Sequence, residues 1–347
     1  MCVDDSCLPV EQKIRQKARS LGIEKCGVIK PEDMLDYADK LRERMSRIPD
    51  GEAVYGRFVG FADVRRSFPW AKSIVVAVTR YGRYVIPEAA RARYGKSYLT
   101  DSRFNPDSPE RKILNSFGAY LEELGLKTAF NEHPGLTAMR WAAHKAGLGI
   151  IRRNNFFYTE KGSWHTITAW ITDGEMELTE RHDLKECPSD CNRCIKACPT
   201  KSLSMPYTMN MATCVSKLTT SNDQNSYDDA TNGQIGAWIY GCDACQDACP
   251  MNRDKWSEAD DFPGLEDLSP FLSPEKILAA TYEEIERVLS RKFFYINKES
   301  LWRWKLNAIN AMVNDYRNVF APLIENALRD EYPIVRERAK RALEKII

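Results

Sequence analysis

Residues 187–199 (CPSDCNRCIKACP) and 242–250 (CDACQDACP) decide the fold of the middle of this chain. With Cys214 between them, they hold eight of the eleven cysteines. The spacing Cys-x2-Cys-x3-Cys-Pro is typical of [4Fe–4S] ligands, and two such segments predict two clusters. A pair of zinc sites is the alternative for so many neighbouring thiolates, but the Cys-Pro end of each segment favours iron–sulfur.

The two segments divide their cysteines between two sets. In two-cluster ferredoxin folds, the cysteine that precedes proline binds the other cluster. That rule assigns to one cluster a first thiol set, Cys187, Cys191, Cys194 and Cys249, and to the other a second thiol set, Cys198, Cys214, Cys242 and Cys245. Cys187 departs most from the pattern, because three residues instead of two separate it from Cys191.

The three remaining cysteines do not extend the motif. Cys26 lies in the apolar stretch CGVI and is predicted to be a small buried strand residue. Cys2 and Cys7 are predicted to be surface thiols. Cysteines two and three residues apart rarely form disulfides with each other, so the pattern favours metal binding in a reducing compartment.

The composition is that of an ordinary globular protein with two or three domains. The chain has 347 residues, of which 43% are hydrophobic and 29% charged, and a formal net charge of +1. So small a net charge gives no overall attraction to nucleic acid or membranes. No apolar run approaches the roughly 18 residues of a membrane span, and the N-terminus has no signal-peptide pattern, so we expect a cytoplasmic protein without membrane partners.

Residues 1–180 are predicted to form an α/β domain. Predicted helices cover residues 11–22, 32–46, 109–124 and 136–146, and predicted strands cover residues 26–29, 73–78, 127–130 and 166–172. The run SIVVAV at 73–78 is apolar throughout. Such a run is typical of a strand that is covered on both faces, as in a parallel or mixed sheet.

Two stretches of this domain are considered as ligand-binding segments. Residues 80–109 are basic, aromatic and irregular, and the sequence leaves open whether they form a surface loop or one wall of a ligand cleft. The Gly-x-Gly at 147–149 follows a predicted helix instead of preceding one and lacks a third glycine at the required spacing. A dinucleotide-binding site is therefore rejected.

The rest of the chain divides into three parts. Residues 181–255 are predicted to be a ferredoxin-like two-cluster module, 256–273 a proline-containing linker, and 274–347 an all-α domain with the rhythm of a short helical repeat. A protein that only carried electrons would not need the domains on either side of the module. We therefore expect a terminal electron acceptor, most simply a cofactor in the α/β domain.

Further stretches carry a family resemblance. They are FADVRRSFPWAKSIVVAV (61–78), MRWAAHKAGLG (139–149), GSWHTITAWITD (162–173), CNRCIKACPTKSL (191–203), YGCDACQDACPMN (240–252), LNAINAMVN (306–314) and LRDEYPIVRERAKRAL (328–343). In these segments the chain resembles the epoxyqueuosine reductases, corrinoid-dependent iron–sulfur enzymes of queuosine tRNA modification. More distantly, its core resembles the reductive dehalogenases.

The resemblance implies an architecture, cofactors and partners. The α/β domain would bind base-off cobalamin, the clusters would reduce its cobalt, and residues 274–347 would be HEAT-like helices. The residues at the family's cofactor-binding motifs are Arg140, Gly149, Arg152, Arg153, Asn154 and Ser163. An electron donor of the flavodoxin or ferredoxin type is implied, with epoxyqueuosine in tRNA or a related small organic molecule as substrate. No Asp-x-His-x-x-Gly is present, and His144 is predicted to be exposed on its helix.

Departures from the family gather near the expected substrate pocket. After AGLG the family reads Trp-x-Gly-Lys-Asn, whereas 150–154 read IIRRN, and Arg152 and Arg153 could bind a phosphate, a carboxylate or the corrinoid edge. The family's catalytic aspartate falls on His133, beside Glu132. His133 could donate a proton because its ordinary pKa is near neutral, and Glu132 could if burial raises its pKa. Otherwise His133 belongs to an exposed turn.

The substrate and the enzymatic role each have a rival. Four basic residues near the C-terminus could contact tRNA phosphates, although nearby glutamates dilute their charge: Arg336, Arg338, Lys340 and Arg341. The substrate could instead be a small organic molecule, as in the dehalogenases. From a different class, the protein could be an electron-transfer or activator protein that reduces a partner corrinoid protein.

Overall fold

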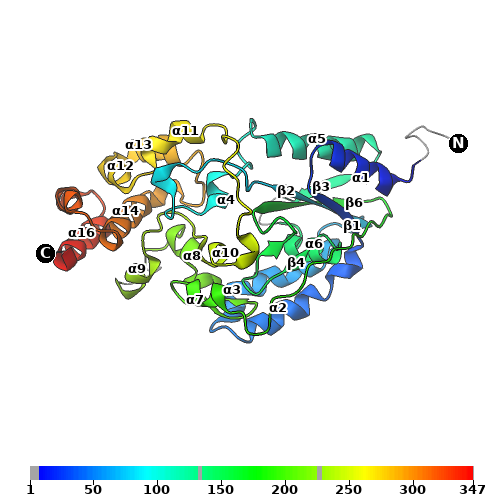
Figure 1. The fold of residues 1–347 in the computed structure, drawn as a ribbon, viewed down its shortest axis with the longest axis horizontal. Coiled ribbons are helices and arrows are strands. Elements are labelled where there is room, and N and C mark those ends of the chain that lie inside the picture. The colour runs from blue at the N-terminus through cyan, green and yellow to red at the C-terminus, as the bar shows by residue number, and fades with distance from the viewer. Residues whose placement is uncertain (1–7, 132–134, 225–228, 347) are drawn as a thin grey trace.

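The computed structural model of this protein describes residues 8–131, 135–224 and 229–346. Figure 1 shows an elongated molecule with a sheet and its helices at one end and the C-terminal helices at the other. Three short helices lie between these ends, α7 (Arg193–Ala197), α8 (Val215–Thr219) and α10 (Ala244–Asp247). Cys2 and Cys7 fall outside the described residues.

The sheet has four strands in the order β1-β2-β6-β3. They are β1 (Lys25–Ile29), β2 (Ser73–Arg80), β6 (His165–Thr172) and β3 (Thr128–Asn131). All neighbours pair antiparallel, so the expectation of a parallel or mixed sheet is wrong. An apolar run indicates only that both faces of a strand are covered, and helices can cover both faces of an antiparallel sheet as well.

Helices cover both faces of this sheet. Val75 and Ala77 of β2 pack in one apolar cluster with α1 (Val10–Ser20) and α5 (Pro109–Glu123). The alternate residues of β2 pack in another cluster with α6 (Met139–Lys145). Successive strand side chains point to opposite faces, which explains why every residue of SIVVAV is buried. Cys26 of β1 is buried, as predicted.

The remaining elements of the first 180 residues are short. They are α2 (Tyr37–Met45), α3 (Gly51–Tyr55), α4 (Lys96–Leu99), β4 (Ile150–Ile151) and β5 (Phe157–Tyr158). Helices α2 and α3 pack on each other through a small apolar cluster of their own. The two-residue strands β4 and β5 pair antiparallel and form the turn that carries the double arginine.

Residues 80–103 are not a surface loop. Tyr84 and Tyr94 are fully buried in an apolar cluster that also contains the C-terminal helices. The surface interpretation is therefore wrong for this part of the chain. The alternative, a cleft wall, holds for Tyr81, Tyr98 and Arg103, which line the large cavity described below.

The middle and C-terminal parts are built mainly from helices. Besides α7, α8 and α10, the middle contains β7 (Leu203–Met205), β8 (Thr208–Met209) and α9 (Asp229–Ile235). The C-terminal helices are α11 (Leu265–Leu268), α12 (Pro274–Ala279), α13 (Tyr282–Leu289), α14 (Trp302–Asn314), α15 (Ala321–Asn326) and α16 (Pro333–Ile346). Within the described ranges, no helix has the length and apolar character that crossing a membrane requires.

Helix α14 joins the C-terminal helices to the two-cluster module, because its side chains are buried along most of its length. The Asn307 side chain donates to the carbonyls of Thr219 and Ile239, at 2.8 Å each. Arg338 of α16 is buried and donates to Asn310 of α14. Arg338 therefore stabilises the helix packing, and the suggestion that it contacts phosphates is wrong.

Candidate functional site: two thiol sets and an adjoining cavity

Two short helices position the thiols. Helix α7 carries Cys194 and α10 carries Cys245, and the two helices pack against each other. Each is followed by the Cys-Pro step that ends its segment, Cys198 after α7 and Cys249 after α10. Because the helices are in contact, the last cysteine of each segment can reach the other segment's set.

The electrostatic neighbours of the thiols follow the crossed assignment. The pKa of Cys194 is raised to about 11, mainly by burial, and the other three thiols of the first set contribute to the rise. Burial also raises the pKa of Cys245, and the other three thiols of the second set add to that rise. Each of these thiols therefore has its own predicted set as its thiol neighbours, which supports the crossed ligand scheme.

Each predicted set provides four free thiols. In a [4Fe–4S] cluster each of four thiolates binds a different iron, so the sulfurs lie around the cluster instead of around one point. The two sets therefore fit two such clusters.

Backbone hydrogen bonds reach two sulfurs of the second set. The backbone N–H of Leu203 donates to Sγ of Cys198, and that of Ala244 donates to Sγ of Cys242, at 3.4 Å each. Hydrogen bonds to cluster sulfurs are one of the factors that set reduction potentials. The fold therefore supplies part of the tuning of the second set through its own backbone.

Arg152 and Arg153 are directed at the loop of the first set. Arg152 is 4% exposed, its guanidinium lies 5.2 Å from the ring centre of Tyr158, and Nη1 lies 3.6 Å from Sγ of Cys187. Nη1 of Arg153 donates to three backbone carbonyls within residues 188–191, at 2.5 to 2.9 Å. Neither side chain lines the large cavity, so a substrate phosphate is not their partner in this arrangement.

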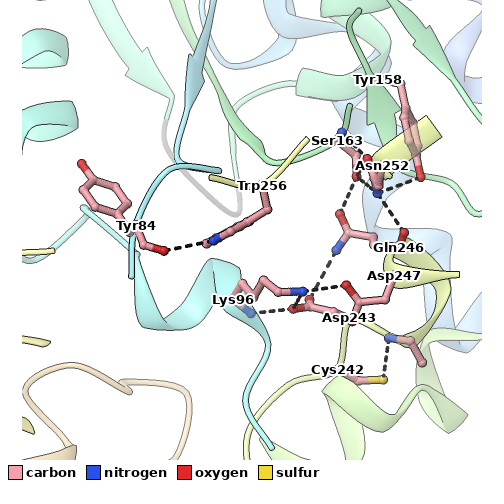
Figure 2. A network of polar contacts seen from close by, with 11 residues as sticks. Tyr84, Lys96, Tyr158, Ser163, Cys242, Asp243, Gln246, Asp247, Asn252 and Trp256 are labelled. Carbon is pink, nitrogen blue, oxygen red and sulfur yellow. Dashed lines mark hydrogen bonds and ion pairs between the residues drawn. The ribbon is translucent and has the colours of Figure 1, made fainter. Parts of the chain in front are cut away.

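Ser163 and Asn252 tie the α/β part to the cluster loops (Figure 2). The Ser163 N–H donates to Oδ1 of Asn252 at 2.8 Å, and Nδ2 of Asn252 donates to the Ser163 hydroxyl and to the Gln246 carbonyl, at 2.9 Å each. Nearby, Asn154 donates to the Tyr158 hydroxyl at 2.9 Å. Asn154 and Ser163, both expected at the cofactor, are thus held by internal hydrogen bonds.

Helix α4 is tied to α10 in the same region (Figure 2). The Lys96 N–H donates to the buried Asp243 carboxylate at 2.7 Å, and its ammonium pairs with Asp247 at 2.6 Å. The Trp256 indole donates to the Tyr84 carbonyl at 3.0 Å. These contacts hold the 80–103 segment, and with it one cavity wall, against the two-cluster module.

A cavity of about 840 Å³ lies near Cys214 of the second thiol set, although none of the described cysteines lines it. Its walls come from α2, α3, α6, β6 and residues 97–103 and 207–211. Tyr98 lines it and its hydroxyl lies 2.6 Å from that of Ser216, two residues after Cys214. Burial raises the pKa of Tyr55, another lining residue, and Cys214 adds to that rise. The cavity thus reaches the surroundings of a predicted cluster ligand.

Only some of the expected cofactor-binding residues line this cavity. Arg140 and Ser163 line it, whereas Gly149 and Asn154 do not. A Cβ at Gly149 would lie 2.1 Å from the Tyr158 carbonyl oxygen, so that glycine permits the close approach of β4 and β5. His144 is half-buried, lines the cavity and lies 3.3 Å from the Gly149 carbonyl, so the expectation that it is exposed is wrong.

His133 and Glu132, the two expected proton donors, lie outside the described residues. Thr137 and Ala138 line the cavity, followed by Arg140 on α6. In the sequence, His133 and Glu132 come a few residues before Thr137, which lines the cavity. Their role as proton donors stays a prediction.

His165 is a cavity residue that sequence reasoning did not single out. Its Nε2 atom is buried and has no hydrogen-bond partner. The pKa of His165 is lowered from 6.5 to about 3, mainly by burial; a hydrogen bond with the Phe157 backbone opposes this shift, and the charge of Arg80 adds to it. The imidazole is therefore neutral at physiological pH.

The depressed pKa of His165 predicts a pH-dependent stability. Between about pH 6.5 and 3 the unfolded chain binds a proton that the folded chain does not, so stability falls as the pH falls through this window. At pH 5 the loss from this group is about 2 kcal/mol. We expect His165→Phe to lose less thermal stability than the parent protein between pH 7 and pH 5. Parallel melting profiles of the two proteins would contradict this assignment.

Comparison with known proteins places the chain in a family. A family model described as a 4Fe-4S double cluster binding domain matches residues 186–252. An epoxyqueuosine reductase of Cellulophaga algicola is 30% identical over 251 residues, which cover 69% of this chain and 78% of that protein. The chain belongs to the epoxyqueuosine reductase family. A family member from Bacillus subtilis is 27% identical over 370 residues, covering 97% of this chain and 88% of that protein.

Solved structures of epoxyqueuosine reductases share the fold. One, in complex with a tRNA-Tyr epoxyqueuosine-modified stem loop, matches with a TM-score of 0.79 and 23% identity over 97% of this chain and 90% of that one. The enzyme from Streptococcus thermophilus matches with a TM-score of 0.77 and 25% identity over 98% and 90%. As a family member, this chain is an iron–sulfur oxidoreductase with two [4Fe–4S] clusters.

Several residues line the cavity of this epoxyqueuosine reductase relative although the sequence did not identify them as site residues. They are Arg44, Tyr55, Tyr98, Asn155 and His165. For Arg44 a signal existed, because Lys40, Arg44 and Arg47 are four and three residues apart and so share one face of a helix. For the others, only the tertiary structure brings the side chains to one wall.

Proposed function

We propose that this protein is a cobalamin-dependent reductase that removes the epoxide oxygen of epoxyqueuosine in tRNA. The proposal rests first on its family, since relatives of this sequence are epoxyqueuosine reductases. It rests on the structure through one observation, the cavity that lies near Cys214 of the second thiol set. The activity, the cytoplasmic location and the HEAT-like nature of α12 to α16 belong to this proposal.

The cavity suits a large ligand with a polar edge. Its volume, about 840 Å³, lies in the upper part of the range of small-molecule sites. Buried polar atoms without partners line it, among them Nε of Arg44 and both amide atoms of Asn155. Such atoms favour a ligand that completes their hydrogen bonds, because an unsatisfied buried polar group is costly. Arg140 and Ser163 line the same cavity and would hold the corrinoid.

Bound cobalamin would supply a low-valent cobalt centre, a strong nucleophile, at the cavity. The chain's own part is to deliver electrons through the clusters, to orient the substrate and to supply a proton. Deoxygenation of an epoxide to an alkene consumes two electrons and two protons and releases the oxygen as water. The clusters carry the electrons one at a time, from a donor that we expect to be a flavodoxin or ferredoxin.

Anaerobic reconstitution with iron, sulfide and cobalamin tests the proposal directly. We expect the corrinoid to remain bound through desalting, and a stem loop carrying epoxyqueuosine to lose the mass of one oxygen atom under reducing conditions. Nucleoside mass spectrometry measures that loss. Protein with intact clusters that retains no corrinoid would overturn the cofactor assignment and support the electron-transfer or activator alternative. Bound corrinoid without turnover of the stem loop would support the alternative that the substrate is a small organic molecule.

The proton donor gives a second prediction. We expect His133→Ala to lower turnover by at least about a hundredfold, since general acid catalysis contributes that much or more. The visible spectra of clusters and corrinoid should not change, because the substitution leaves both cofactors in place. Glu132→Gln is the matched comparison at the neighbouring position. An unaffected rate in His133→Ala with a large loss in Glu132→Gln would move the role to Glu132.

A further inference from the structure

Two arginine side chains from different helices line the same cavity. Arg44 extends from α2 and Arg140 from α6, and both line the cavity. Nε of Arg44 is buried and has no hydrogen-bond partner, and its guanidinium lies 5.9 Å from the Tyr55 ring centre. Nη1 of Arg140 donates to the backbone carbonyl of Asn155. Helices distant in sequence thus bring two positive charges together.

No carboxylate neutralises this pair among the residues that the structure describes. The acidic residue nearest in sequence, Glu43, is already bonded to Arg47 and lies 3.8 Å from the ammonium of Lys40. Burial lowers the pKa of Arg44, and the charge of Arg140 lowers it further. The hydroxyls of Tyr55 and Tyr37 oppose these two effects, so the partners of Arg44 here are neutral tyrosines and not a carboxylate.

Asn155 adds neutral hydrogen-bonding groups to the same wall. It is 2% exposed, and neither its amide nitrogen nor its amide oxygen has a partner. Its backbone lies in the left-handed region with φ of 64°, and its carbonyl accepts the hydrogen bond from Arg140. A buried amide with both atoms unsatisfied is rare in folded proteins, so both atoms are available to a ligand in the cavity.

We propose that Arg44, Arg140 and Asn155 form a subsite for a phosphodiester. A guanidinium binds phosphate oxygens through two parallel hydrogen bonds, and the Asn155 amide can donate a third. The chemical identity rests on the proposed function, because corrinoid and tRNA, the two ligands which that function brings to this cavity, both carry a phosphodiester. The subsite takes the role that the sequence suggested for Arg152 and Arg153, whose guanidinium groups instead hold the first thiol set.

Arg44→Gln tests the subsite, with Arg42→Gln as its matched control. Arg42 lies on the same helix but is exposed and paired with Asp39 at 2.9 Å, so both variants lose one positive charge from α2. The first probe is inorganic phosphate, compared with chloride at equal ionic strength by thermal unfolding of cluster-loaded protein without corrinoid. We expect Arg44→Gln to weaken phosphate binding about tenfold or more and Arg42→Gln to leave it unchanged. Equal melting in chloride shows that both variants fold.

Two further arms identify the source of the phosphodiester. If it belongs to the corrinoid, Arg44→Gln weakens binding of cobalamin but not of cobinamide, which lacks the phosphodiester. If it belongs to tRNA, the substitution weakens binding of the stem loop and lowers the slope of log K against log salt by about 1. Either result supports the subsite.

Equal behaviour of Arg44→Gln and Arg42→Gln in all three arms would overturn the subsite. The phosphate arm needs neither corrinoid nor turnover, so it separates this inference from the proposed function. Selective phosphate binding in a protein that never deoxygenates the stem loop would sink the function and keep the subsite. If parent and Arg44→Gln deoxygenate the stem loop at the same rate and bind phosphate equally, the proposed function is kept and the subsite is rejected.

Discussion

Cys214→Ala should leave the protein with about half of its iron. Cys214 is predicted to bind the cluster of the second thiol set, and a [4Fe–4S] cluster that loses one of four thiolates is expected to be lost on purification. The cluster of the first set has its own four thiols and should remain. Iron and sulfide analysis after anaerobic reconstitution measures the outcome. Full iron content in the variant would remove Cys214 from the ligand set.

The crossed assignment makes a sharper prediction for the two Cys-Pro cysteines. Cys198→Ala should lose the same cluster as Cys214→Ala, although Cys198 is close in sequence to Cys194 of the first set. The two variants should therefore show the same remaining electron paramagnetic resonance signal, different from that of Cys194→Ala. Cys26→Ala is the control, because Cys26 is buried in the sheet and belongs to neither set. A Cys198→Ala spectrum that matched Cys194→Ala would show that the ligands do not cross.

Asn252→Ala should destabilise the junction between the α/β part and the cluster loops. The substitution removes a partner of the Ser163 N–H, of the Ser163 hydroxyl and of the Gln246 carbonyl. The hydroxyl keeps its bond to Oε1 of Gln246, and the carbonyl keeps the Cys249 N–H, so only the buried Ser163 N–H is left unsatisfied. One such group costs about 1 to 3 kcal/mol, which is the loss we expect. Because Asn252 follows Cys249 by three residues, the cluster of the first set should also become easier to remove.

Thermal unfolding and the rate of iron loss to a chelator measure these two effects. Asn192→Ala is the matched control, since Asn192 lies in the same module but is exposed. We expect the control to melt within about a degree of the parent protein, as surface substitutions usually do. A melting temperature of Asn252→Ala equal to that of the control would show that the network in Figure 2 contributes little to stability.

Local chemistry explains what could be predicted early. The thiol sets follow from spacing, because one short segment must place three sulfurs around one cluster. The strand at 73–78 follows from its unbroken apolar run, and α5 begins at Pro109 after Ser108, whose side chain accepts from the Arg111 N–H. These features depend on neighbours a few residues apart, which the sequence displays directly.

Contacts between distant segments explain what the sequence did not reveal. Whether two strands pair parallel or antiparallel depends on the path of the chain that connects them. The apolar run of β2 fits either direction, and the structure shows that β2 and β6 are antiparallel. Tyr84 and Tyr94 look like surface residues of a basic loop until the C-terminal helices cover them. The role of Arg152 depends on Cys187, which lies 35 residues later and approaches it only in the folded chain.

The sequence by itself determined the two-cluster module and the family, and it predicts which cysteines bind the clusters. The spacing of the ligands depends only on residues that are close together in the sequence, so it can be recognised without the tertiary structure. Only the tertiary structure decided which polar groups face the cavity, because α2, α6 and the turn after β4 bring Arg44, Arg140 and Asn155 together from separate parts of the chain. Burial then leaves those groups without partners, and an unsatisfied buried group is a property of the fold and not of the residue.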